Sequence, residues 1–267
     1  MKEPAHIGLV KNDSYLAPYE DAIRGRHEHA LWKMNQLTQD GKLSLSEFAN
    51  GYNYYGLHRT KDGWVFREWA PNATEIFLIG DFNDWKEQEA YQCQRLEGTG
   101  NWELILPEDA LQHGQYYKMR VHWQGGEGER IPAWSQRVVQ DDATKIFSAQ
   151  VWAPKKPFVW KKKTFKPQTS PLLIYECHIG MAQDEEKVGT YNEFREKVLP
   201  RIIKDGYNAI QIMAIQEHPY YGSFGYHVSS FFAASSRFGT PEDLKALIDE
   251  AHKNGVAVIM DIVHSHA

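Results

Sequence analysis

The C-terminal third of the chain alternates strand signals with helix signals, and this alternation constrains the fold more than any other feature. Apolar runs typical of strands lie at 172–175, 209–215 and 256–263. Between them, one helix opens at Thr190 with Glu193 three residues on, and another opens at Thr240 followed by Pro241. The apolar stripes predict which helical residues are buried: Tyr191, Phe194, Val198 and Ile202, then Leu244, Leu247, Ile248 and Ala251. This order predicts right-handed βαβ units with parallel strands.

The run at 172–175 (Leu-Leu-Ile-Tyr) predicts a strand that is buried on both faces. The pattern fits an open doubly wound sheet or an eight-stranded barrel. No glycine-rich phosphate loop follows any of the three strands, which disfavours a dinucleotide-binding or P-loop fold. The sequence stops at Ala267, directly after the third strand, with no helix to cover it. We therefore expect a fragment.

The N-terminal residues have a different period. Apolar or aromatic side chains recur at helical spacing before Gly41, which predicts helix over most of 1–50. From Tyr54 the period becomes that of strands. Short runs such as 64–69 and 117–123, bounded by turn residues, predict a small β-sandwich over 51–153.

Four prolines punctuate 154–171, which we interpret as a linker carrying a solvated basic run at 161–163. The predicted order is thus a helical segment at 1–50, a sandwich at 51–153, the linker at 154–171 and an incomplete α/β unit at 172–267.

Composition excludes several classes of function. The net charge of −5 implies no nucleic-acid partner. The sequence contains no run of about 18 apolar residues, so no membrane span is predicted. Cys93 and Cys177 are too few for a disulfide framework, which favours the cytoplasm. The sequence shows no cluster of metal ligands with recognisable spacing, so no metal site is expected. No cofactor is expected either. Aromatic residues make up 13% of the chain, which suits a core or a carbohydrate-binding surface.

Polar side chains follow all three predicted strands. Glu176, Cys177 and His178 follow the first, the loop at 220–227 follows the second, and 261–266 follows the third. Because the active site of a barrel lies at the carboxyl ends of its strands, these residues predict a functional rim.

The residues at 261–266 (Asp-Ile-Val-His-Ser-His) resemble the motif at the third barrel strand of the α-amylase superfamily. That superfamily usually has Asn where this chain has Ser265. The form Val-His-Ser-His is similar to the version in eukaryotic-type glycogen branching enzymes. Further similar segments lie at 67–71, 80–85, 175–180, 220–227 and 231–241, and the resemblance begins near Tyr15. It implies a β-sandwich carbohydrate-binding module after the helical segment, then the first three strands of a truncated (β/α)8 TIM barrel.

The resemblance also implies roles for particular residues. Tyr226 is expected to stack on a sugar ring at the cleavage subsite, Asp261 to support that subsite, and His266 to donate to a hydroxyl of the same sugar. Their alternatives are a core residue, a strand-end cap and a packing residue. Glucan contacts on the sandwich are expected from three residues: Trp69, Trp85 and Lys118. The alternative for Trp69 is the sandwich core. Glu176 and His178 are expected to support the rim.

The implied reaction is glycogen branching, a retaining transglycosylation on an α-1,4-glucan such as glycogen or amylose. One carboxylate attacks the anomeric carbon while a second protonates the leaving oxygen, and a glucan 6-hydroxyl then resolves the intermediate. In the family, the nucleophile and the acid lie on later strands, so the chain alone is expected to be inactive. The alternatives are a debranching enzyme or amylase of the same superfamily, and a glucan-binding protein without chemistry.

Overall fold

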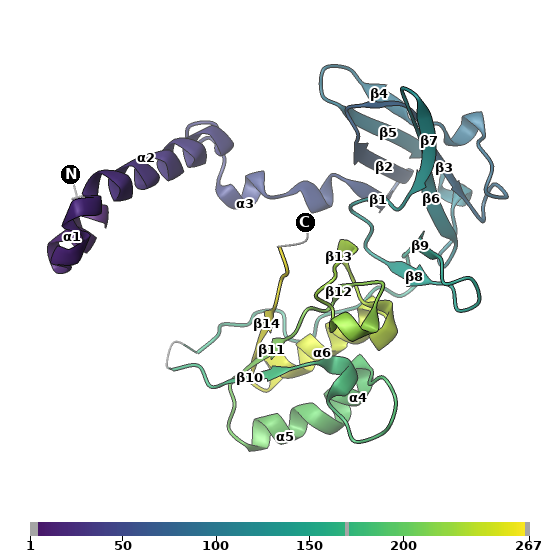
Figure 1. The fold of residues 1–267 in the computed structure, drawn as a ribbon. Coiled ribbons are helices and arrows are strands. Elements are labelled where there is room, and N and C mark those ends of the chain that lie inside the picture. The colour runs from purple at the N-terminus through teal and green to yellow at the C-terminus, as the bar shows by residue number, and fades with distance from the viewer. Residues whose placement is uncertain (1–4, 169–170, 265–267) are drawn as a thin grey trace. The chain divides into compact units, whose positions relative to one another are not determined.

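The computed structural model describes residues 5–168 and 171–264 (Figure 1). The chain divides into two compact units, Met1–Tyr54 and Tyr55–Ala267, which are described separately. Within the described ranges, no helix is long and apolar enough to cross a membrane.

The first unit is helical, which confirms the prediction for this stretch. It contains α1 (Ala5–Asn12), a 3₁₀ turn (Ser14–Tyr19), α2 (Glu20–Leu37), α3 (Leu45–Phe48) and a second 3₁₀ turn (Gly51–Asn53). Glu20 and Asp21 lie in the first turn of α2, where carboxylates stabilise the positive end of the helix dipole. Ser44 and Glu47 form a capping box that begins α3. None of the side chains in α2 is buried, so its apolar stripe does not build a core within this unit.

The second unit begins with two antiparallel sheets. One has the order β1 (Gly56–Thr60), β2 (Gly63–Trp69), β5 (Asn101–Leu106), β4 (Gln94–Leu96). The other has the order β3 (Ala73–Gly80), β6 (Tyr116–Trp123), β9 (Phe147–Gln150), β8 (Val138–Gln140), with β7 (Gly126–Arg130) also on β6. Alternate residues of β5, namely Trp102, Leu104 and Leu106, are buried, as a half-buried strand requires. They pack with Trp64, Phe66, Ile76, Leu78, Tyr117 and Met119 in one apolar core.

Residues 154–168 and 171 contain neither helix nor strand. The buried carboxylate of Asp249 anchors this segment, because it accepts hydrogen bonds from the backbone amides of Lys161 (3.1 Å) and Lys162 (2.8 Å). The ring of Phe165 stacks on His252, with ring centroids 4.1 Å apart. The segment is therefore attached to α6 (Pro241–Lys253) rather than free.

The C-terminal part is a parallel sheet of three strands in the order β10 (Ile174–Cys177), β11 (Ala209–Ile212), β14 (Ala257–Met260). The connections are helical: α4 (Tyr191–Glu193), a π-helical turn (Phe194–Val198) and α5 (Leu199–Lys204) join β10 to β11. Helix α6 precedes β14. Thr190 and Thr240 are the N-caps of α4 and α6, as the sequence predicts. The capping box predicted at Thr190 forms, and Thr240 forms one with Asp243 as well. The stripe of Tyr191, Phe194, Val198 and Ile202 is buried as predicted.

Three predictions are corrected. The run at 172–175 is not buried on both faces: Leu173 is 56% exposed and Ile174 is 43% exposed. The strand β10 also lies at the edge of the sheet, with β11 on one side only. The second strand ends at Ile212 instead of residue 215. The stretch expected to be a loop, 216–238, contains the antiparallel pair β12 (Gln216–Glu217) and β13 (Ser230–Ala234).

Candidate functional site

A tight turn after β3 sets the direction of Trp85. The buried amide of Asn83 accepts a hydrogen bond from the backbone amide of Gly80 (2.9 Å) and donates to the carbonyl of Leu78 (2.9 Å). Asp84 and Trp85 follow with φ of +54° and +59°, the left-handed region that residues with a Cβ rarely adopt. Such strain persists only where the surroundings impose it, and it is common at functional sites.

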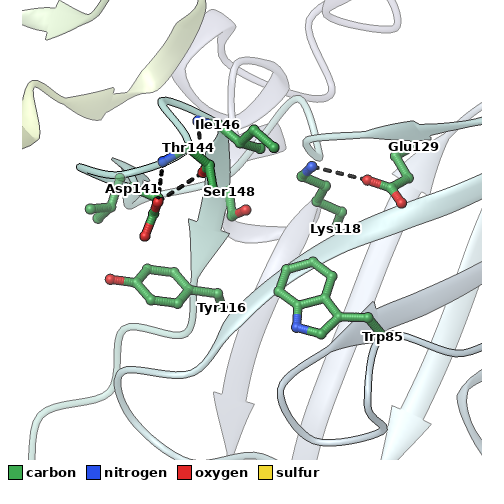
Figure 2. Close-up of a pocket in the computed structure, with 9 residues that line it drawn as sticks. Trp85, Tyr116, Lys118, Glu129, Asp141, Thr144, Ile146 and Ser148 are labelled. Atoms are coloured by element: carbon green, nitrogen blue, oxygen red, sulfur yellow. Dashed lines mark hydrogen bonds and ion pairs between the residues drawn. The ribbon is translucent and has the colours of Figure 1, made fainter.

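Asp81 fixes two aromatic residues with one carboxylate. One oxygen accepts from the indole Nε1 of Trp85 (3.1 Å), and the other accepts from the backbone amide of Tyr116 (2.7 Å). Figure 2 shows the two rings next to each other on the floor of a pocket. Flat rings with one exposed face are suited to the apolar faces of sugars.

The pocket has a volume of about 390 Å³. The rings, the strands β6 and β7 and the hairpin between β8 and β9 form it, through Trp85, Tyr116, Lys118, Glu129, Val139, Asp141, Thr144, Ile146 and Ser148 (Figure 2). Asp141 shapes the hairpin by accepting from the amides of Ala143 and Thr144, and the Thr144 bonds lower the pKa of its carboxyl. The ammonium of Lys118 donates to Glu129 at 3.0 Å.

Of the three sandwich residues predicted to contact ligand, Trp85 and Lys118 share this pocket and Trp69 does not line it. Trp69 ends β2 in the other sheet and is 59% exposed, so the alternative that it belongs to the sandwich core is wrong. The buried carboxylate of Glu68 accepts from the backbone amide of Trp69 (3.1 Å) and fixes its position. Burial raises the pKa of Glu68.

At the carboxyl ends of the parallel strands, the phenol of Tyr226 donates to Asp261 at 2.9 Å. Tyr226 comes from the segment between β12 and β13, and Asp261 directly follows β14. Gly225 explains the approach of the loop: its φ is +88°, and a Cβ there would lie 1.8 Å from the carbonyl oxygen of Ala214. Burial, together with the hydrogen bond to Asp261, raises the pKa of Tyr226.

Glu176 lies beside this pair and accepts from the side-chain amide of Gln211 (3.2 Å). His178 is buried among the rings of Tyr221, Phe224 and Phe238, whose centroids lie 5.5–5.9 Å away. Burial lowers the pKa of His178, with a smaller contribution from His218. Cys177 is buried and its pKa is raised to about 12 by burial. His266 lies outside the described residues.

Comparison with known proteins shows which families the chain is similar to. Residues 54–135 match carbohydrate-binding module 48 (isoamylase N-terminal domain), and residues 182–267 match the α-amylase catalytic domain. Named 1,4-alpha-glucan-branching enzymes are similar along almost all of the chain: 42% identical in Dictyostelium discoideum (97% of the chain), 46% in Yarrowia lipolytica (98%) and 40% in Equus caballus (97%). The chain is a homologue of the eukaryotic 1,4-alpha-glucan-branching enzymes.

The chain spans 38% of the length of each of those three relatives. Among solved structures, a pullulanase from Bacillus acidopullulyticus matches 79% of the chain and 29% of its own length, with a TM-score of 0.64 and 19% identity. A pullulanase from Paenibacillus barengoltzii complexed with maltotriose matches 78% of the chain and 37% of its own length, with a TM-score of 0.63 and 22% identity. The fold is therefore a module-48 sandwich followed by the first strands of an α-amylase barrel, which decides between the two architectures left open by the sequence.

Sequence reasoning missed how this branching-enzyme homologue holds the loop that carries Tyr226. Glu217 is fully buried, accepts from the backbone amide of Ser236 (2.7 Å), and lies 3.5 Å from the guanidinium of Arg237. Arg237 in turn donates to the carbonyls of His218 and Pro219. The partners lie about twenty residues apart in the sequence, so no local pattern predicts their contact. The adjacent Glu217 and His218, which follow an apolar run, were the available sign of a buried polar site.

One group of possible metal ligands lies elsewhere on the sandwich. Ligand atoms of Glu87, His122 and Glu127 lie within 4.8 Å of one another. The Nε2 of His122 is 2.8 Å from Glu87 and its Nδ1 is 3.2 Å from Glu127. Since the carboxylates contact opposite ring nitrogens, and Glu127 also pairs with Arg120, the arrangement suits a hydrogen-bonded network better than the coordination of one ion.

Proposed function

We propose that the protein is a 1,4-α-glucan-branching enzyme that acts by retaining double displacement. The observation that carries the proposal is the 40–46% identity to named branching enzymes along 97–98% of the chain, which includes both candidate sites. The substrates proposed are α-1,4-glucans such as glycogen and amylose. The acceptor in the second step is a 6-hydroxyl of a glucan instead of water.

The rim residues are proposed to hold the sugar at which the chain is cut. Tyr226 stacks on its ring and Asp261 accepts hydrogen bonds from its hydroxyls, while His266 donates to one of them. The contact between Tyr226 and Asp261 supports this assignment, since it orients the phenol and leaves the ring as a platform. Neither residue is proposed as nucleophile or acid, so the chain alone is proposed to be inactive.

The sandwich is proposed to hold a more distant part of the same glucan. Trp85 supplies a stacking surface and Lys118 supplies hydrogen-bond donors in the shared pocket. Trp69 is proposed as a separate contact on the other sheet. The proposed domain boundaries remain 1–50, 51–153, 154–171 and 172–267. The proposed compartment is the cytoplasm, supported by the two buried, unpaired cysteines.

The test is the reaction of the full-length protein with amylose. Branching predicts new branches that isoamylase removes, together with loss of the iodine colour. Short linear sugars would instead favour a debranching enzyme or amylase, and binding without either product would favour a glucan-binding protein. Asp261→Asn should abolish branching while the glucan affinity of the sandwich persists. Residues 1–267 alone should leave the iodine colour unchanged.

A further inference from the structure

Glu129 lies on the wall of the pocket that Trp85, Tyr116 and Lys118 line, hereafter the sandwich pocket. It lies on β7, is 39% exposed, and one carboxylate oxygen accepts from the ammonium of Lys118 at 3.0 Å. The other oxygen lies 3.2 Å from the guanidinium of Arg120. Arg120 and Lys118 alternate with buried positions on β6, so both side chains lie on the same face of the sheet. Glu129 is therefore held from both sides at the edge of the pocket, and Figure 2 shows its contact with Lys118.

The pairing cancels the positive charge of Lys118 at the pocket wall. The side chain of Lys118 is 13% exposed, and Glu129 cancels its charge at contact distance. Arg120 is balanced in turn by Glu127, 3.3 Å away. Asp141, the remaining carboxylate of the pocket, is occupied by two backbone amides and a hydroxyl. The ammonium has three N–H groups and Glu129 uses one, so two remain to donate to a ligand.

A wall with free donors but no uncompensated positive charge distinguishes two classes of carbohydrate. Neutral hydroxyl groups accept hydrogen bonds from the ammonium without displacing Glu129. A phosphate group carries close to two negative charges at neutral pH and would meet the Glu129 carboxylate at short range. Like charges that are placed together in this way oppose binding, and repulsion of the wrong ligand is an established source of specificity.

We propose that Glu129 determines the specificity of the sandwich pocket: by neutralising Lys118, it selects unmodified α-1,4-glucan and disfavours phosphorylated glucan. The proposal rests on the proposed glucan-binding function of this pocket. Glu129 is a positioning and screening residue here, because it acts through Lys118 and through its own charge instead of through stacking. Without it, the Lys118 ammonium becomes an uncompensated positive charge at the edge of the pocket.

The experiment measures the affinity of residues 1–267 for two probes, maltoheptaose and maltoheptaose bearing a 6-phosphate. Glu129→Gln keeps the size and an acceptor oxygen but removes the charge. We expect it to tighten binding of the phosphorylated probe on the order of fivefold, and to change binding of the neutral probe by less than about twofold. The gain should shrink at 1 M salt, because exposed charges are then screened within about 3 Å.

The matched control is Glu127→Gln. Glu127 lies on the same strand, pairs with the same arginine, and does not line the pocket. The variant Glu127→Gln removes one negative charge from the sandwich, as Glu129→Gln does. The ratio of its affinities for the phosphorylated and the neutral probe should stay near that of the unmodified chain. A double variant, Glu129→Gln with Lys118→Met, should lose the gain for the phosphorylated probe.

The outcomes separate the two proposals. If the unmodified chain binds neither probe, the proposed function of the pocket fails, and this inference with it. If the unmodified chain binds maltoheptaose but Glu129→Gln leaves the ratio of affinities unchanged, only the specificity role of Glu129 is refuted. An equal change in Glu129→Gln and Glu127→Gln also refutes it, since a general field effect would then explain the selectivity.

Discussion

The turn that presents Trp85 depends on one buried amide, and Asn83→Ala removes it. The amide of Asn83 makes two hydrogen bonds to the backbone of β3, to Gly80 and to Leu78, both at 2.9 Å. The backbone amide of Trp85 also donates to the Gly80 carbonyl (3.0 Å), so the same few atoms hold the aromatic residue. The left-handed φ angles of Asp84 and Trp85 oppose the turn, and Asn83 offsets that strain.

The cost follows from these contacts. Each buried hydrogen bond contributes about 1 kcal/mol net, and each buried partner left unpaired costs about 1–3 kcal/mol. Alanine removes both bonds and leaves the Gly80 amide and the Leu78 carbonyl without this partner. We therefore expect the sandwich to lose about 2–4 kcal/mol of unfolding free energy. Since Trp85 would then sample other orientations, its affinity for maltoheptaose should fall by about tenfold or more, which corresponds to about 1.4 kcal/mol.

The assay is urea unfolding followed by circular dichroism, together with the binding of maltoheptaose to the folded variant. Gln88→Ala is the control, because Gln88 reaches the same turn only through a long contact of 3.4 Å to the Asn83 carbonyl. It should change stability by less than about 0.5 kcal/mol. An Asn83→Ala variant as stable as Gln88→Ala, with an unchanged affinity, would refute the reasoning that this amide positions Trp85.

Three further predictions concern the C-terminal part. The thiol of Cys177 has a pKa of about 12, so at pH 8 it should react with iodoacetamide about a thousandfold more slowly than a free cysteine of pKa near 8.5. Mass spectrometry would measure the alkylation, and unfolding the protein should abolish the difference. Glu217→Ala leaves Arg237 without its buried partner, so it should cost about 3–5 kcal/mol and expose 216–238 to limited proteolysis, unlike Glu196→Ala on the surface. His178 has a lowered pKa in the folded state, so the unfolded state binds more protons as pH falls through about 6.5, and stability then decreases. In His178→Phe, the loss of urea stability between pH 7.5 and 5.5 should therefore be smaller.

Elements with a local signal could be predicted from the sequence. The helices that begin at Thr190 and Thr240 are specified by side chains within three residues of each cap, and both capping boxes form. The parallel pairing of the three C-terminal strands also follows, because each helix between them is long enough to return the chain to the same end of the sheet.

Features decided by distant residues could not be predicted in this way. The ribbon of β12 and β13 forms inside a stretch expected to be a loop, since the backbone of Glu217 pairs with that of Ser230 and its side chain accepts from Ser236. The exposure of Trp69 depends on which sheet its strand joins and where that strand ends. An apolar run such as 172–175 has the same sequence whether its strand is central or at an edge.

The candidate sites divide along the same line. Trp85, Tyr226 and Asp261 were selected from segments with family resemblance, and Lys118 was selected as a candidate contact on the predicted sandwich. Their roles in binding stay predictions. The sequence did not indicate that Trp85 and Lys118 share a pocket with residues 139–148, because these come from separate strands and a hairpin. The composition of the pocket follows from the order of strands within one sheet, which no local sequence signal specifies.

The stacking roles proposed for Trp85 and Tyr226 raise the same physical problem in both candidate sites. A ring that stacks on a sugar must keep one face open, so packing on two faces cannot hold it. In each site a carboxylate holds the polar end of the ring instead: Asp81 accepts from the indole of Trp85, and Asp261 accepts from the phenol of Tyr226. Hydrogen bonds to a charged acceptor are stronger than neutral ones, and they fix the ring without covering its face. Under the proposed function, the use of Trp and Tyr at these positions follows from this requirement, because Phe offers the same face but no donor by which an acidic residue can orient it.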